Sequence, residues 1–428
     1  MTGAATIFAL SSGRPPAAVA VVRISGPAAH DAARRLAGDL PETRRAALRT
    51  LTDPRDGAVI DEALLLRFDG PASATGEDVA EFHCHGGRAV VDALLAALGA
   101  IDGLRHAEPG EFTRRAFANG RIDLTEAEGL ADLLEAETES QRRAALVLAG
   151  GGLRRQVEQW RRRLVELSAR AEAAIDYVGD EAETAIDEDQ LRDEARELAD
   201  ELGDWLERPR AEILHDGVRV VVAGPPNVGK SSLVNVIAGS DRAIVTSVPG
   251  TTRDAIEVPL AIEGLPFVLV DTAGLRDSDD PVERIGIARA TGELERADIL
   301  LWLGEPGDAP DHRQLLPLHS RCDLAGREAA PEGSIAVSAV TGEGVGGLIV
   351  ELATRARTLV VGDSQLALNR RQATLIEAAS RAISQASPDL VTLAENLRHA
   401  RLSFDRISGR AGVEEVLDAL FGRFCLGK

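Results

Sequence analysis

The stretch Gly224-Pro-Pro-Asn-Val-Gly-Lys-Ser231 has the form G-x-x-x-x-G-K-[ST]. A run of β-forming residues, 218–222, precedes it, and a helical pattern over residues 232–238 follows it. This order of strand, loop and helix is what a phosphate-binding loop requires, because small residues let backbone N–H groups converge on an anion at the positive end of a helix. Lys230 is then predicted to reach the β- and γ-phosphates, and the Ser231 hydroxyl to ligate Mg²⁺. The stretch therefore predicts a nucleotide-binding α/β domain.

Other segments of this domain also follow predicted strands. They include Asp271-Thr-Ala-Gly274 and Ser338-Ala339. Open α/β sheets bind ligands at the carboxyl ends of their strands, so both segments are expected beside the phosphate loop. Asp271 is predicted to act on Mg²⁺ through a water, and Thr252 to ligate Mg²⁺ when a γ-phosphate is present.

Asp323 stands where a residue that reads guanine is expected. A carboxylate accepts two hydrogen bonds from the N1–H and N2–H₂ edge of guanine, and adenine offers no such pair of donors. The usual Asn-Lys-x-Asp is Ser320-Arg-Cys-Asp323 in this chain, which puts tight guanine affinity in doubt but not the preference for guanine. The phosphate loop, the segment that contains Thr252, the segment Asp271-Thr-Ala-Gly274 and Asp323 occur in this order and together predict a GTPase.

One catalytic side chain of Ras-type enzymes is missing from the sequence. Those enzymes place a glutamine directly after Asp-x-x-Gly to orient the attacking water, and this chain has Leu275 there. Sequence alone assigns no arginine to replace it. A bound monovalent cation is a plausible substitute, because it can bridge phosphate oxygens as a guanidinium does.

Composition sets the class of protein. The chain has 428 residues, 44% hydrophobic content and a formal net charge of −21. The length predicts two or three soluble globular domains. The charge argues against indiscriminate nucleic-acid binding, so any RNA contact needs a local basic patch or a second subunit. No apolar run is long enough to span a membrane, and the N-terminus lacks the pattern of a signal peptide.

Two residue types are scarce. Three distant cysteines, Cys84, Cys322 and Cys425, predict reduced thiols in a cytoplasmic protein. Lysine occurs only at positions 230 and 428, although the chain has 48 Lys plus Arg. A compact ammonium does work that a planar guanidinium cannot, so Lys428 becomes a candidate functional group. Cys425-Leu-Gly-Lys428 fits a prenylation signal poorly.

The N-terminal region predicts an α/β unit. Residues 19–24, 63–68 and 79–85 have the pattern of strands, and residues 89–98 that of a helix. Alternation along the third strand puts Glu81, His83 and His85 on one face. A polar face that meets a small ligand or a partner is the favoured interpretation of this strand, with a metal site at His83-Cys84-His85 as the alternative.

The remaining chain is predicted to be helical. The pattern runs over residues 124–209, interrupted only at 150–152 and at Gly179, and resumes from residue 364. Five arginines lie between 154 and 163, and residues 176–204 are rich in Asp and Glu. Solvated helix faces are the favoured interpretation, and an arginine-bearing helix that meets an anionic partner is the alternative.

Over essentially its full length the chain resembles the tRNA modification GTPase MnmE (TrmE) family. Six segments carry the resemblance: Val21-Val-Arg-Ile-Ser-Gly-Pro27, Thr75-Gly-Glu-Asp-Val-Ala-Glu-Phe-His-Cys-His-Gly-Gly87, Glu108-Pro-Gly-Glu-Phe-Thr-Arg-Arg-Ala-Phe117, Gly250-Thr-Thr-Arg-Asp254, Asp271-Thr-Ala-Gly-Leu-Arg276 and Cys425-Leu-Gly-Lys428. The resemblance implies a multidomain α/β protein in which a Ras-like, doubly wound GTPase domain is inserted into a helical domain. The implied parts are an N-terminal α+β folate-binding and dimerisation domain (1–118), a first helical part (119–213), the GTPase domain (214–362) and a second helical part (363–428).

The resemblance also implies site residues. Residues expected to contact GTP are Asn227, Val228, Gly229, Lys230, Ser231, Ser232, Thr246, Ser247, Val248, Pro249, Gly250, Thr251, Thr252, Asp271, Thr272, Ala273, Gly274, Asp323, Ser338 and Ala339. K⁺ is expected on Asn227, Thr246, Val248 and Thr251, and formyl-tetrahydrofolate on Arg23, Glu81, Arg121 and Lys428, where Arg121 replaces a frequent lysine. Glu283 is expected to activate the attacking water, and Cys425 is either a nucleophile or an ordinary buried thiol.

The implied activity is GTP hydrolysis coupled to tRNA modification. A homodimer would act with the FAD-containing MnmG subunit as a heterotetramer, installing aminomethyl or carboxymethylaminomethyl groups at carbon 5 of the wobble uridine. The alternative is a GTP-switched factor that binds RNA in ribosome assembly without modifying it. The C-terminal motif and the folate-like N-terminal segments favour modification.

Overall fold

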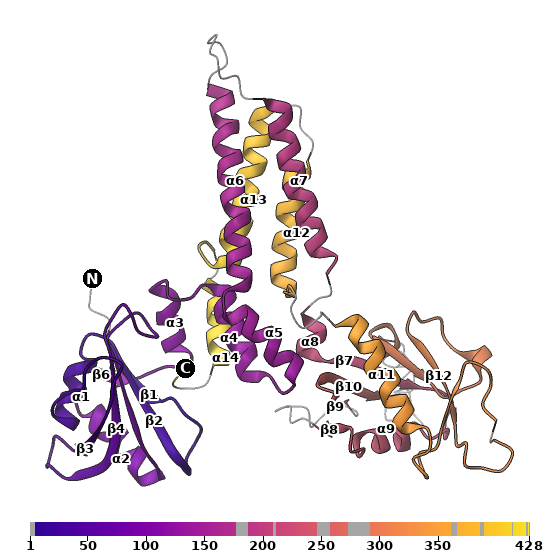
Figure 1. Ribbon diagram of the computed structural model, residues 1–428, viewed down its shortest axis with the longest axis horizontal. Helices are drawn as coiled ribbons and strands as arrows, with labels where there is room; N and C mark the ends of the chain where they lie inside the picture. The colour runs from indigo at the N-terminus through magenta and orange to yellow at the C-terminus, as the bar shows by residue number, and fades with distance from the viewer. Residues whose placement is uncertain are drawn as a thin grey trace, which may run out of the picture. The chain divides into compact units, whose positions relative to one another are not determined.

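The computed structural model describes residues 5–176, 187–208, 211–245, 257–272, 292–327, 329–360, 366–385, 389–412, 414–424 and 427. The chain folds into two compact units (Figure 1). The first combines residues 1–131 with 405–428, and the second comprises residues 132–404. The four-part division with boundaries at 118, 213 and 362 stays a prediction.

The first unit is built on a six-stranded sheet in the order β3-β4-β5-β2-β1-β6. Neighbouring strands are antiparallel, except that β1 and β6 run parallel. Its strands are β1 (Thr6–Leu10), β2 (Ala17–Ser25), β3 (Ala46–Thr52), β4 (Val59–Phe68), β5 (Val79–Gly86) and β6 (Leu104–His106). Alternation along these strands buries one face against α1 (Ala29–Ala37) and α2 (Arg88–Gly99), with Phe82 and Leu94 fully buried in the shared core.

Two further helices of this unit come from opposite ends of the chain. They are α3 (Glu111–Ala118) and α14 (Glu414–Arg423), and they contact each other. Gly110 makes the close approach possible, because a Cβ there would lie 2.4 Å from the carbonyl oxygen of Phe421. Phe117 and Phe421 complete the contact, with ring centroids 6.4 Å apart.

The helical part of the second unit packs around aromatic side chains. Along α6 (Gly152–Asp176) the buried residues follow the helical repeat, and Trp160 is fully buried. Its ring lies 5.1 Å from that of Trp205 and 5.7 Å from that of Phe404, and its indole N–H donates to Glu201. Over the described residues, the other helices outside the nucleotide domain are α4 (Leu124–Glu135), α5 (Glu139–Ala149), α7 (Glu188–Leu206), α8 (Glu212–Asp216), α12 (Arg370–Ser384) and α13 (Leu390–Ser408).

The prediction of continuous helix from residue 124 to the glycines at 150–152 was wrong. The helix is interrupted between α4 and α5. There the Thr138 side chain accepts from the backbone N–H of Gln141, and the Gln141 side chain accepts from the backbone N–H of Thr138. This capping box starts a new helix without any glycine or proline to signal it. Gly179 lies outside the described residues.

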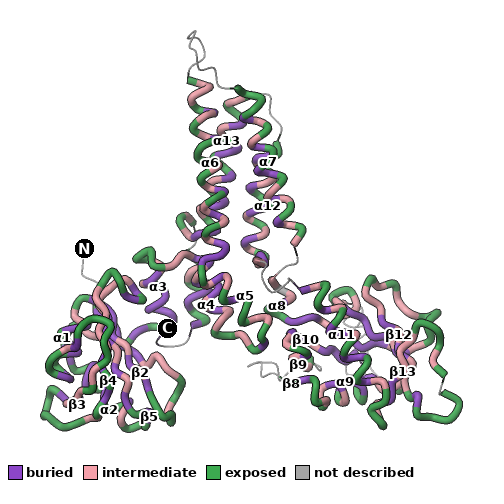
Figure 2. The backbone as a smooth tube through the Cα atoms, viewed as in Figure 1, coloured by how far each residue is buried: buried purple, intermediate pink, exposed green. Residues whose placement is uncertain are grey.

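The nucleotide domain has a seven-stranded sheet in the order β13-β12-β11-β7-β10-β9-β8. Five strands are parallel, and β9 and β8 form an antiparallel edge. The elements are β7 (Val218–Ala223), α9 (Lys230–Ala238), β8 (Ala243–Val245), β9 (Glu257–Ile262), β10 (Leu265–Asp271), β11 (Ile299–Trp302), β12 (Leu315–Ser320), β13 (Ile335–Val337) and α11 (Val345–Leu359). Figure 2 shows that the central strands are the most buried part of this domain.

The multidomain α/β fold with a doubly wound, Ras-like nucleotide domain is confirmed. Strands that sequence analysis omitted include β9 and β12, each of which contains a proline, Pro259 or Pro317. Proline donates no hydrogen bond to a sheet and therefore argues against a strand when only the sequence is read. Over the described residues, no helix combines the length and the apolar character needed to cross a bilayer.

Candidate active site

The phosphate loop leaves the carboxyl end of β7 and turns into α9. Gly224, Asn227 and Gly229 all have positive φ, at 149°, 61° and 102°. At Gly224 space is also tight, because a Cβ would lie 3.2 Å from the Cβ of Leu303. The loop therefore ends at the N-terminus of α9, where backbone N–H groups and the helix dipole favour an anion.

Lys230 and Ser231 occupy the first turn of α9. Lys230 is only 5% exposed, and its ammonium donates to the carbonyl oxygens of Gly224 and Pro225 at 3.0 and 2.8 Å. The Ser231 hydroxyl donates to a carboxylate oxygen of Asp271, because the parallel pairing of β7 and β10 places Asp271 opposite Val222. A hydroxyl beside a carboxylate is an oxygen donor set that fits Mg²⁺.

A cavity of about 330 Å³ adjoins the loop. Its lining includes Asp323 and Arg321 together with loop residues Val228 and Gly229. Arg321 has a φ of 59°, and its guanidinium donates to the carbonyl oxygen of Asn227, so the segment that carries Asp323 is tied directly to the phosphate loop. The cavity thus presents one carboxylate next to the phosphate site, as recognition of guanine requires.

Ser338 precedes two residues that line this cavity, Ala339 and Val340. It is fully buried, and its hydroxyl oxygen accepts from the backbone N–H groups of Val340 and Thr341 at 3.2 and 3.1 Å. These bonds hold the turn that carries Ala339 and the highly exposed Val340 along the cavity.

Sequence analysis missed several side chains that build the cavity. Arg321 was noted only as a departure from lysine, and its bond to Asn227 spans 94 residues of sequence. Leu303 and Val340 also line the cavity. Leu303 follows strand β11, and that position at a strand end was the available signal.

Several residues predicted for the site lie outside the described residues. They are Thr246, Ser247, Val248, Pro249, Gly250, Thr251, Thr252, Ala273, Gly274, Glu283, Cys425 and Lys428. Thr272 is described, and its hydroxyl donates to the carbonyl oxygen of Val222 at 2.8 Å, next to the start of the phosphate loop.

A second group of predicted residues lies on the sheet of the first unit. Arg23 on β2 and Glu81 on β5 form an ion pair with a distance of 2.8 Å between Nε and Oε1. The other oxygen of Glu81 lies 3.3 Å from Nε2 of His83, and the Arg23 guanidinium lies 5.7 Å from the centre of the Phe112 ring. The Glu81 carboxylate can accept hydrogen bonds from N–H groups, and the Arg23 guanidinium can donate to carboxylates. A folate has groups of both kinds.

Arg121 lies on a different segment from this pair. Its Nε donates to the carbonyl oxygen of Ser73 at 3.1 Å, and a Cβ at Gly76 would lie 3.2 Å from its side chain. Within the described part of the chain, Arg121 makes no hydrogen bond or ion pair with Arg23 or Glu81.

The C-terminal glycine lies against the first strand. The Ser11 hydroxyl donates to the carbonyl oxygen of Gly427 at 2.8 Å, and a Cβ on Gly427, whose φ is 90°, would lie 2.0 Å from the carbonyl oxygen of Leu10. Ala9, the residue before Leu10, pairs with Arg23 across β1 and β2. The residue that precedes Lys428 is therefore held at the end of β1, on the sheet that carries the Arg23–Glu81 pair.

His83-Cys84-His85 does not form a metal cluster. Cys84 is 2% exposed and lies on the buried face, where burial raises the pKa of its thiol. His83 and His85 lie on the other face, and Nδ1 of His85 is 2.8 Å from a carboxylate oxygen of Asp61. A thiol on the opposite face cannot join His83 and His85 in one ligand set. That this polar face meets a small ligand or a partner stays a prediction.

The phosphate loop, the Ser231–Asp271 pair and the cavity with Asp323 define a GTP-binding protein of the P-loop class. Two protein-family models agree with this class, and together they match most of the chain. Residues 6–121 match the N-terminus of the GTP-binding protein TrmE, and residues 124–425 match the MnmE helical domain.

Full-length relatives identify the family. The chain is 52% identical over 430 residues to the tRNA modification GTPase MnmE of Erythrobacter litoralis, covering 99% of this chain and 100% of the relative. It is 51% identical to the protein of the same name from Novosphingobium aromaticivorans, covering 99% of both chains. The chain belongs to the tRNA modification GTPase MnmE family, and it is a GTP hydrolase.

Among solved structures, the G domain of the T. maritima FeoB iron transporter matches 32% of this chain and 98% of its own, with 24% identity and a TM-score of 0.23.

Proposed function

We propose that this chain couples GTP hydrolysis to modification of the wobble uridine in certain tRNAs, together with an FAD-containing MnmG partner. The product would carry an aminomethyl or carboxymethylaminomethyl group at carbon 5. The observation that carries the proposal is the position of Gly427 at the end of β1, on the sheet that holds Arg23 and Glu81. It supports a role in modification because the C-terminal segment and the Arg23–Glu81 pair, which are both outside the GTPase domain, lie on one sheet.

For hydrolysis, the chain's own groups compensate the charge of the phosphates. Backbone N–H groups at the start of α9 and the buried Lys230 ammonium would neutralise the β- and γ-phosphates. Ser231 would ligate Mg²⁺ with Asp271 in its outer sphere, and Thr252 would join when the γ-phosphate is bound. Mg²⁺ would supply charge neutralisation there.

Two further roles follow from Leu275, which cannot orient water. Asn227 offers a neutral amide oxygen in an exposed loop, a donor that suits K⁺, and Thr246, Val248 and Thr251 would complete that site. Glu283 would position the attacking water. K⁺ would supply the positive charge that an arginine supplies in other GTPases.

For the one-carbon unit, we assign Arg23, Glu81, Arg121 and Lys428 to formyl-tetrahydrofolate in a homodimer. Glu81 can accept hydrogen bonds from the pterin edge, and a guanidinium can pair with the glutamate tail. Cys425 stays a candidate nucleophile.

The net charge of −21 supports a division of labour with the partner. An acidic protein attracts tRNA weakly, so the partner in the heterotetramer would supply much of the positive field. Three cysteines far apart in the sequence support a cytoplasmic location.

Mass spectrometry of tRNA nucleosides tests the proposal. A strain without this gene is expected to lack the modified wobble uridine, and the wild-type gene to restore it. Unchanged wobble uridines in the deletion strain would refute the proposal, and an accompanying defect in ribosomal subunits would favour the RNA-binding alternative.

The role of K⁺ is tested separately. GTP turnover of the wild type is expected to be faster in K⁺ than in Na⁺, and Asn227→Ala to remove that difference. Asn235→Ala, an exposed residue of the same type on α9, is the matched control. Equal rates of the wild-type protein in the two salts would remove Asn227 from the mechanism.

A further inference from the structure

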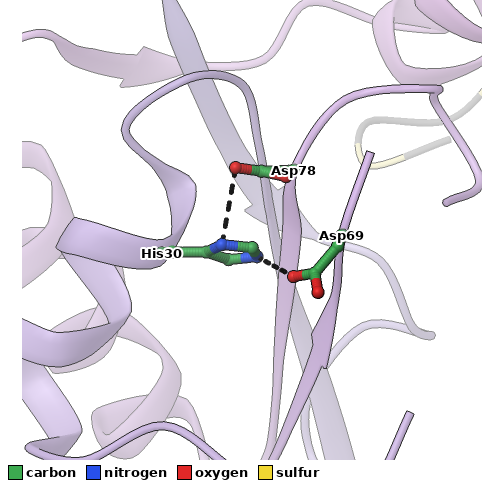
Figure 3. Close-up of side chains that lie close together, drawn as sticks. All are labelled: His30, Asp69 and Asp78. Carbon is green, nitrogen blue, oxygen red and sulfur yellow. Dashed lines mark ion pairs between the residues drawn. The ribbon is translucent and has the colours of Figure 1, made fainter. Parts of the chain in front are cut away.

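Three side chains that can ligate a metal converge in the first unit, and none of them is among the residues assigned above. They are His30 in the first turn of α1, Asp69 just after β4 and Asp78 just before β5 (Figure 3). One ligand atom from each can be chosen so that all lie within 4.8 Å of one another. His30 is 8% exposed, and the two aspartate side chains are about half-buried and reachable from solvent.

Oxygen atoms lie close to both nitrogens of the His30 ring. Nδ1 lies 3.4 Å from a carboxylate oxygen of Asp78, and Nε2 lies 3.1 Å from the carbonyl oxygen of Phe68 and 3.8 Å from Asp69. A neutral imidazole has one N–H and one lone pair. In either tautomer, therefore, one ring nitrogen directs its lone pair at an oxygen that is also an acceptor. A metal ion held by that nitrogen and by the carboxylate oxygens would remove this repulsion.

The carboxylates are held in place by neighbouring donors. One oxygen of Asp78 accepts from the backbone N–H of Gly70 at 2.9 Å, which leaves the other oxygen facing His30. Nε of Arg67 donates to Oδ1 of Asp69 at 2.7 Å, and this is the oxygen that lies 3.8 Å from Nε2 of His30, so a metal ion would bind Asp69 through its other oxygen or displace Arg67. Such outer hydrogen bonds orient ligands before a metal arrives and are typical of built metal sites.

We propose that His30, Asp69 and Asp78 bind one divalent transition-metal ion of the Zn²⁺ type. One imidazole nitrogen and two carboxylate oxygens suit such an ion, whereas Mg²⁺ and Ca²⁺ prefer oxygen ligands alone. The ion ties α1 to both ends of the segment 69–78. That segment carries Ser73, which accepts from Arg121, and Glu77, which pairs with Arg115 at 3.0 Å. The site would thus have a structural role, because the ion would fix both ends of this segment to α1.

Calorimetry of the full-length protein with Zn²⁺ tests the site. The wild type is expected to bind one Zn²⁺ per chain that excess Mg²⁺ does not displace. Asp78→Asn keeps the oxygen that accepts from Gly70 but loses the charge, and it is expected to weaken binding by at least about tenfold. His30→Gln should weaken it similarly. His85→Gln, which removes an exposed histidine paired with Asp61, is the matched control and should bind like the wild type.

Co²⁺ provides a readout of the ligands themselves. Its visible absorption in the wild-type protein should change in the His30 and Asp78 variants and stay unchanged in His85→Gln. Absence of Zn²⁺ binding by the wild type would overturn the proposal. Equal binding by the wild type and Asp78→Asn would overturn it as well.

Discussion

Glu111, at the start of α3, offers the sharpest test of how the first unit is stabilised. Its carboxylate accepts from the guanidinium of Arg105 at 2.5 and 2.7 Å, from the backbone N–H of Glu108 at 2.9 Å and from Arg115 at 2.9 Å. Burial opposes ionisation, but these donors outweigh it and lower the pKa of Glu111 from 4.5 to about 2. The carboxylate therefore links β6 to α3.

The lowered pKa gives a magnitude for this link. At about 1.36 kcal/mol per pKa unit, the change from 4.5 to about 2 corresponds to roughly 3 kcal/mol of stability. Arg105 is 45% exposed, so water screens part of the interaction. We expect Glu111→Gln to lower the free energy of opening of α3 by about 2 kcal/mol at pH 7, a factor of about 30 in the opening equilibrium.

The direction of the pH dependence follows from the lowered pKa. The stabilisation is complete above pH 4.5, where Glu111 is ionised in both the folded and the unfolded chain. As pH falls from 4.5 towards 2, the unfolded chain takes up the proton first, so the difference between wild type and Glu111→Gln should shrink.

Amide hydrogen exchange of residues 104–118 in the full-length protein measures this opening. Glu108→Gln is the matched control. Glu108 lies three residues before Glu111 and its side chain is exposed, so this substitution removes the same charge from a side chain that is not buried. Equal loss of protection in the two variants, or a deficit in Glu111→Gln that stays constant down to pH 2, would refute the role given to Glu111.

The remaining predictions concern the two functional regions. Asp323→Asn replaces a double acceptor with a side chain that also donates, so GTP affinity should fall roughly tenfold to a hundredfold while affinity for xanthosine triphosphate rises. Competition with a fluorescent nucleotide measures both, and unchanged GTP affinity would remove Asp323 from base recognition. Gly427→Ala directs a Cβ to within 2.0 Å of the carbonyl oxygen of Leu10 and should displace the C-terminus. Modified uridine should then fall several-fold while GTP turnover stays at the wild-type level; a loss of both would argue for general unfolding instead.

Local chemistry made part of the site predictable from sequence. The turn of the phosphate loop and the helical pattern over residues 232–238 depend on neighbouring residues, and the structure has the turn and a helix over Lys230–Ala238. The strand expected before Asp271 is also present, as β10. Where the deciding interaction was a side-chain cap, as at Thr138, the pattern of apolar residues did not reveal it. The strands β9 and β12 were not predicted because each contains a proline, and pairing with neighbouring strands stabilises them in the structure.

By itself, the sequence determined the class of protein, because a phosphate loop and a guanine-reading carboxylate are short runs of residues whose chemistry needs little beyond their own backbone. Only the tertiary structure decided which distant groups meet. Strand pairing sets Asp271 beside Ser231, Arg321 reaches Asn227 across 94 residues, and Ser11 holds Gly427 across 416. The meeting of His30 with Asp69 and Asp78 belongs with these, because it depends on how α1 packs against two strand ends. Such contacts follow from strand order and core packing, which no short run of residues encodes.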